Sequence, residues 1–340
     1  MRANETRSPW ADAAKAIGII LVVLAHALPK DTYPWTWINL FHMPLFFCVS
    51  GYLYTCKGSF IHYALKKIKG LWVPYVVSSI ITYAAFLLLG KETFSIKYIG
   101  KMLLMVSPGP LLGALWFLPV LLIASLICDL MNRILRYVKF NTQTTTDAIL
   151  SVICIGMLFL GYRFTLPYKI SVALRAVFFM HLGHLLKGIR VNKMRRLVTG
   201  LLAMIVVTIS AFYTKTSFLN NTYTRPLLSL LAAICGSIGV CMLCQLLFQK
   251  DKPGWLMCIG RNSLGILVWQ FVAFKLVTVI QIAVYHLPMN RIWDFPVLVD
   301  KASAPWVLLN LAIGIAGSLC LYKIINSPIQ RLLNEGRKIQ

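Results

Sequence analysis

The sequence is poor in charged residues, and above all in acidic ones. Only 13% of its 340 residues are charged, and 10 Asp and Glu face 34 Lys and Arg. Soluble domains carry about 25% charged and about 45–50% apolar residues, whereas 59% of this chain is hydrophobic. A water-soluble fold of this size could not bury that much apolar surface. The composition therefore excludes a soluble enzyme, a nucleic-acid-binding protein and a disordered chain.

The basic residues, which give a net charge of +24, lie between apolar blocks rather than on one face. This favours a membrane protein over one that binds a polyanion. A helix needs about 20 apolar residues to cross a bilayer. Ten segments are predicted to do so: 13–30, 37–56, 71–90, 111–132, 147–162, 168–187, 196–213, 225–248, 262–284 and 305–325. We therefore predict an all-α, polytopic membrane protein with a single transmembrane domain over residues 1–340.

The distribution of Lys and Arg predicts the orientation, because cytoplasmic loops carry the excess of basic residues. With a cytoplasmic N-terminus, 22 basic residues fall inside and nine outside. Both termini are therefore predicted to be cytoplasmic. An apolar run before Ala25-His26-Ala27 also imitates a cleaved secretory signal. Cleavage is the less favoured alternative, because it would invert this charge bias.

The first predicted span carries two ionisable side chains, which are costly in a membrane and usually functional. Lys15 and His26 are eleven residues apart. In a helix this spacing puts them on one face, about 16 Å apart along the axis. Such a face could line a slot for a long ligand with an anionic end near Lys15 and a reactive end near His26. The alternatives are that Lys15 extends to the interface and that His26 is structural.

The second predicted span follows after a short connection, so the two spans form a hairpin. Its residues Asn39 and His42 share a helix face, and the hairpin brings His42 to the depth of His26. Two imidazoles and an amide at one level predict a catalytic cluster, since neutral imidazole is suited to accepting a proton from a hydroxyl. A zinc site would need a third or fourth ligand. None is evident, so no metal is expected.

Four further residues are candidates for binding. Lys66 and Lys69, in the predicted loop after the second span, could hold phosphate groups beside Lys15; the alternative is the ordinary cytoplasmic excess of basic residues. Trp116 and Arg175 are candidate substrate-binding residues. The alternative for Trp116 is an aromatic interface belt, and the alternatives for Arg175 are an ion pair within the membrane or a side chain that extends to the interface.

In order, these motifs resemble membrane-bound acyltransferase family 3, with the fucose 4-O-acetylase-like branch as the nearest match. They are Asp-x-x-Lys…Gly…His in the first span, Phe-His-Met-Pro-Leu-Phe-Phe…Ser-Gly-Tyr over 41–52, basic residues before Pro-Tyr at 74–75, and Leu-Trp-Phe-Leu at 115–118. The resemblance covers essentially the whole chain, including Gly-Arg-Asn-Ser-Leu over 260–264 at the start of the ninth span.

The resemblance implies transfer of an acyl group, commonly acetyl, across the bacterial inner membrane. The donor would be a cytoplasmic acyl-CoA, and the acceptor a hydroxyl of an extracytoplasmic glycan or lipid-linked sugar. The family's essential catalytic histidine corresponds to His26, the basic residue eleven positions earlier to Lys15, and the cytoplasmic basic pair to Lys66 and Lys69. In the family that pair is usually Arg and lies nearer the proline. Gln270 stands where the family often carries His.

The expected mechanism places the CoA phosphates on the three lysines and the thioester near His26. His26 would act as a general base or as a nucleophile, and the residues do not separate the two. His42 and Asn39 would orient His26 or bind the oxyanion. The alternatives are a transporter or flippase for glycans or lipids and a catalytically silent member of the family.

Overall fold

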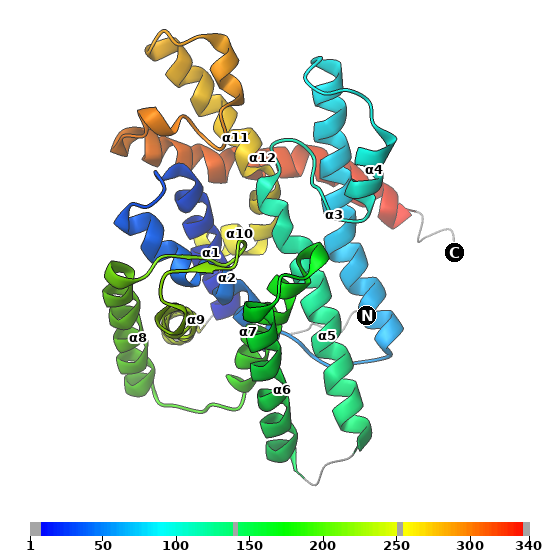
Figure 1. The fold of residues 1–340 in the computed structure, drawn as a ribbon, viewed down its shortest axis with the longest axis vertical. Helices are drawn as coiled ribbons and strands as arrows, with labels where there is room; N and C mark the ends of the chain where they lie inside the picture. Colours follow the sequence, from blue (N-terminus) through cyan, green and yellow to red (C-terminus); the bar gives the residue numbers. More distant parts are fainter. Residues whose placement is uncertain (1–7, 139–141, 250–253, 336–340) are drawn as a thin grey trace.

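The computed structural model describes residues 8–138, 142–249 and 254–335. Helices dominate this part of the chain, and a two-stranded antiparallel hairpin is the one sheet within it (Figure 1). The α-helices are α1 (Pro9–Ala27), α2 (Tyr33–Tyr52), α3 (Phe60–Leu88), α4 (Ile96–Leu103), α5 (Phe117–Val138), α6 (Gln143–Arg163), α7 (Ile170–Leu185), α8 (Lys193–Tyr213), α9 (Pro226–Leu247), α10 (Trp255–Arg261), α11 (Ser263–Val284) and α12 (Ala304–Glu335). The remaining elements are the 3-10 turns η1 (Gly113–Trp116), η2 (Pro167–Lys169), η3 (Met289–Trp293) and η4 (Val299–Lys301), and the strands β1 (Thr216–Ser217) and β2 (Thr222–Tyr223).

Each of the ten predicted segments overlaps one helix of 16 residues or more, so the predicted fold class is confirmed. In the described ranges, eight helices are long and apolar enough to cross a membrane. The other two predicted spans are α2, which carries several polar side chains, and α7, which has 16 residues. The number of crossings and the orientation of the termini stay predictions.

The prediction of a loop around Lys66 and Lys69 is wrong, because both residues lie in helix α3. Helix α3 begins at Phe60, where the Ser59 side chain accepts a hydrogen bond from the His62 backbone amide and so caps the helix. Lys and Leu are good helix formers, so the basic stretch continues into the apolar one without a break. Both lysines therefore lie on the exposed first turns of α3.

Helices α2 and α7 are in direct contact along the middle of the protein. Glycines permit this on both sides. A Cβ atom on Gly51 would lie 1.8 Å from the Met180 carbonyl oxygen, and one on Gly183 would lie 1.8 Å from that of Cys48. The two backbones therefore meet without side chains between them, which is a frequent solution in membrane helices.

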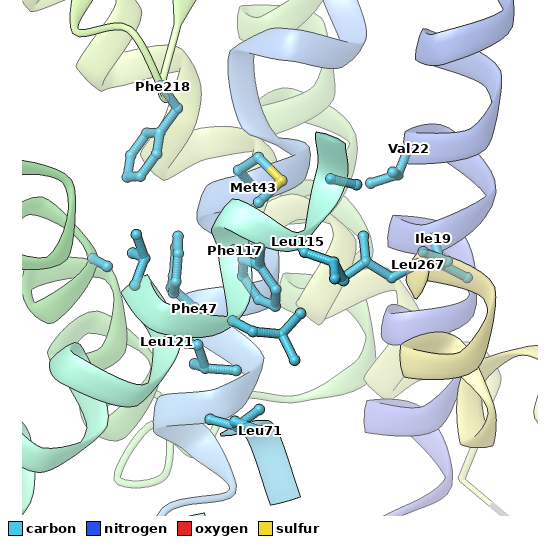
Figure 2. Packing of buried hydrophobic residues seen from close by; sticks show 14 of the residues in the cluster. Ile19, Val22, Met43, Phe47, Leu71, Leu115, Phe117, Leu121, Phe218 and Leu267 are labelled. Atoms are coloured by element: carbon cyan, nitrogen blue, oxygen red, sulfur yellow. The ribbon is translucent and has the colours of Figure 1, made fainter. Parts of the chain in front are cut away.

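Helix α1 packs against α2, α9, α10, α11 and α12. The largest apolar cluster lies along this contact, and Figure 2 shows part of it, including Val22 of α1, Met43 of α2 and Leu267 of α11. The polar side chains of α1 and α2 are thus surrounded by apolar packing from several helices.

We predict that Gly51→Val lowers the stability of the folded protein by about 2 kcal/mol or more, because the new side chain forces α2 and α7 apart. The measurement is thermal unfolding in detergent. Gly156→Val on α6 is the matched control, since nothing lies within 4 Å of its Cβ position. Equal losses in the two variants would contradict the close contact.

Candidate active site

Two cavities open along one face of α1. The Lys15 cavity has a volume of about 220 Å³ and the His26 cavity about 350 Å³. Lys15, Ile19 and Val22 line the first, and Val22 and His26 line the second. These positions are spaced by four, three and four residues, which is the spacing of one helical face. The structure thus places Lys15 and His26 along a single wall, as their separation in the sequence predicts.

The two cavities meet at three side chains from three helices. Val22 of α1, Met43 of α2 and Leu267 of α11 line both cavities. Figure 2 shows these three within the apolar packing around α1 and α2. We call them the constriction. It separates an end that carries cations from an end that carries imidazoles.

The His26 ring is fixed by its own helix. Its Nδ1 lies 2.8 Å from the Val22 carbonyl oxygen. Because a carbonyl oxygen can only accept, Nδ1 carries the hydrogen and Nε2 keeps its lone pair in the neutral ring. The ring of Phe271 meets that of His26 edge to face, with centroids 4.7 Å apart. In the neutral form of His26, Nε2 is therefore the atom that can accept a proton.

His42 and Asn39 line the same cavity as His26. His42 Nδ1 lies 2.8 Å from the Ile38 carbonyl oxygen, so its Nε2 also keeps a lone pair. Asn39 donates one amide hydrogen to the Trp35 carbonyl oxygen at 2.8 Å. The second hydrogen of the Asn39 amide can donate to another group. The predicted cluster therefore forms, and its catalytic role stays a prediction.

Gln270 on α11 approaches the His26 ring. It is fully buried, and its Nε2 donates to the Leu267 carbonyl oxygen at 3.2 Å. Its Oε1 has no hydrogen-bond partner among the described residues. Such an orphaned amide oxygen is costly in a buried site, and an imidazolium N–H on His26 would be a suitable donor for it.

The wall of the His26 cavity away from α1 is built by segments between the long helices. Trp116 of η1, Phe218 after β1, and Phe295 all line it. Lys275 on α11 donates hydrogen bonds to the carbonyl oxygens of Asp294 and Pro296 and so ties the Phe295 segment to the helix. Trp116 is therefore positioned to contact whatever occupies the cavity.

Arg291 also stabilises the segment around Phe295 through ion pairs. Its guanidinium donates to the carboxylates of Asp294 and Asp300 at 2.7–3.0 Å. This pairing holds the pKa of the Asp300 carboxyl below its usual range.

Arg175 lines neither cavity, and its role as a substrate-binding residue stays a prediction. Its side chain is fully buried and donates to the Tyr223 hydroxyl. The guanidinium carbon lies 4.8 Å from the ring centroid of Phe218, whose side chain lines the His26 cavity. Arg175 thus packs behind this wall and holds the hairpin.

At the other end, Lys15 Nζ lies 3.2 Å from Asp12 Oδ1, and Arg261 Nε lies 3.5 Å from Asp12 Oδ2. Arg261 lines the Lys15 cavity, whereas Lys66 and Lys69 do not. Arg261 is not among the site residues that the sequence predicts. Its signal was the Gly-Arg pair at 260–261, which entered only as part of a resemblance.

Among the described residues, no group of three or more His, Cys, Asp or Glu side chains is placed to hold a metal ion. His181 and His184 lie elsewhere, beside a void of about 10 Å³. Their partners are the Ser151 hydroxyl at 2.9 Å and the Asp147 carboxylate at 3.9 Å. This pair is occupied by structural contacts.

Comparison with known families decides the class of protein. The model of the acyltransferase domain family, acyltransferase family 3, matches residues 8–323. The chain belongs to this family. No curated protein and no solved structure gives a significant match. The family match and the long apolar helices together make the chain a membrane acyltransferase. The family match also favours an enzyme over a transporter or flippase. The resemblance to the family is confirmed, whereas the fucose 4-O-acetylase-like branch stays a prediction.

Proposed function

We propose that this acyltransferase moves an acyl group, most commonly acetyl, from cytoplasmic acyl-CoA to a hydroxyl of an extracytoplasmic glycan or lipid-linked sugar in the bacterial inner membrane. The observation that carries the proposal is the shared wall of α1, with Lys15 at one end, His26 at the other and the constriction between them. The distance along the helix, about 16 Å, is comparable to an extended pantetheine arm. One donor could therefore reach both ends.

In this mechanism the donor occupies the Lys15 cavity, and its arm passes the constriction so that the thioester meets His26. His26 Nε2 accepts the proton of the acceptor hydroxyl as the oxygen attacks the thioester carbonyl carbon. The C–S bond then breaks, and the thiolate of CoA leaves and takes the proton from the imidazolium. The products are the O-acyl ester and CoA-SH, and His26 returns to its neutral form.

The neighbours of His26 divide the remaining tasks. The unused hydrogen of the Asn39 amide suits the oxyanion of the tetrahedral intermediate. His42 Nε2 is a hydrogen-bond acceptor in the neutral ring, so it suits a neighbouring hydroxyl of the acceptor sugar and would orient that sugar. The Gln270 Oε1 suits the N–H that His26 gains when it is protonated.

The lining of the His26 cavity supports a sugar-like acceptor. Trp35, Trp116, Phe218, Phe271 and Phe295 supply aromatic surface, and the imidazoles and Asn39 supply a few polar groups. This mixture is typical of sites that bind small polar rings and fix their orientation. The resemblance to the fucose 4-O-acetylase-like branch favours a sugar hydroxyl as well.

We predict that His26→Ala lowers acyl transfer by about 10³-fold or more, because the base for the hydroxyl is lost. The variant should still insert in the membrane and bind CoA. The measurement is transfer of a radiolabelled acetyl group from acetyl-CoA to surface glycan in membranes. His62→Ala, which removes an exposed imidazole at the start of α3, is the control. Full activity of His26→Ala would refute the assignment.

We predict that Val22→Trp stops transfer while CoA still binds, because the indole fills the constriction at one end of the Lys15 cavity and leaves the end with Lys15 and Arg261 open. The measurements are the same transfer assay and the affinity for CoA. Leu24→Trp is the control, since Leu24 lies on the same helix and lines neither cavity. Normal transfer by Val22→Trp would show that the donor takes another route.

A further inference from the structure

Arg261 shares a wall of the Lys15 cavity with Lys15, and these two are the charged residues among the side chains that line it. Between them lies Asp12, whose carboxylate contacts both. The Asp12 side chain is 10% exposed, against 29% for Lys15 and 28% for Arg261. The carboxylate thus lies beneath the two cations, which present their positive charge to the cavity.

The backbone around Arg261 is built for this position. A Cβ atom on Gly260 would lie 1.9 Å from the Asp12 carbonyl oxygen. A glycine is therefore required for α10 to lie against the backbone of α1. This contact brings the next residue, Arg261, beside Asp12 and Lys15.

Helix α11 begins two residues later and adds to the positive potential. Its first two residues, Ser263 and Leu264, line the Lys15 cavity, and Asn262 before them makes no side-chain capping bond. The first backbone amides of a long helix carry partial positive charge and bind anions. Two side-chain cations and a helix N-terminus therefore meet at one place.

The rest of the cavity is largely apolar, and its volume of about 220 Å³ is small. Ile19, Phe46, Phe117 and Leu121 line it on the way to the constriction. A ligand that fits has an anionic group at one end and a slender, largely uncharged chain at the other. A phosphate attached to a pantetheine arm has this form.

We propose that Arg261 and Lys15 bind the phosphate next to the pantetheine arm of the acyl donor, with Asp12 as the positioning residue that holds the two cations together. The proposal rests on the proposed function and deepens it. Lys66 and Lys69, exposed on α3, are not needed for this contact.

The test compares three donors that share the acetylpantetheine unit. They are acetyl-CoA, S-acetyl-4′-phosphopantetheine, which lacks the adenosine nucleotide but keeps the phosphate next to the arm, and S-acetylpantetheine, which lacks that phosphate as well. The measurement is kcat/KM for acetyl transfer by the full chain in membranes. Arg261→Ala should lower kcat/KM about 10- to 100-fold for the two phosphorylated donors, which is the scale of one charge-assisted contact. It should change the value for S-acetylpantetheine by less than about twofold.

Two further variants make the comparison specific. Arg261→Lys should recover part of the loss, since it restores the charge without the planar fork. Arg195→Ala, which removes an exposed cation on α8, should leave all three donors unaffected. If Arg261→Ala fails to fold, Arg261→Gln replaces it in the same comparison, with thermal unfolding as the check on folding.

Equal losses for all three donors would overturn the proposal, because a general structural defect does not depend on phosphate. No loss for any donor would overturn it as well. A wild-type protein that transfers acetyl from none of the donors would instead refute the proposed function. A wild-type protein that transfers acetyl while Arg261→Ala shows no selectivity for phosphate would refute this inference alone.

Discussion

The site depends on one constraint: a single face of α1 must carry a cation and an imidazole far enough apart to serve the two ends of one substrate. Lys15, Ile19, Val22 and His26 follow the helical repeat and line two adjacent cavities. An insertion or deletion of one residue between Lys15 and His26 would rotate them by about 100° relative to each other. The surrounding helices must leave that face of α1 open and pack against its other faces.

The polar side chains of the His26 cavity share one hydrogen-bonding pattern. His26, His42 and Asn39 each bond to the backbone carbonyl four residues earlier on their own helix. The bond satisfies one polar atom of each side chain and fixes the direction in which the other polar atom points. In the two histidines it also sets the tautomer, so that Nε2 is the acceptor. Each side chain is thereby oriented by its own helix.

Much of this could be predicted from the sequence, because local periodicity determines it. The long apolar segments and the shared face of Lys15 and His26 follow from helix geometry, and the depth of His42 follows from the short connection before α2. It could not be foreseen that Lys66 and Lys69 lie on a helix and do not line the Lys15 cavity, since this depends on α3 extending back to Phe60. Here a basic stretch with good helix propensity was mistaken for a loop.

The remaining parts of the site depend on contacts between distant segments. Arg261 reaches the cavity because a glycine lets α10 touch α1, about 250 residues away in the chain. Arg175 is buried because the hairpin with Phe218 and Tyr223 folds over it. Neither contact leaves a periodic pattern in the sequence, so the place of Arg261 at the Lys15 cavity and that of Arg175 behind Phe218 could not be predicted.

The central claim is that one extended donor bridges the two ends of this face. An experimental structure of the His26→Ala variant with a non-hydrolysable acetyl-CoA analogue would test it most directly. We expect phosphate density between Lys15 and Arg261. The pantetheine arm should pass between Val22, Met43 and Leu267. The acetyl carbonyl should then lie within hydrogen-bond distance of the position that the His26 imidazole occupies in the wild type. An analogue bound outside this face, or one whose acetyl group ends on the Lys15 side of an intact constriction, would contradict it.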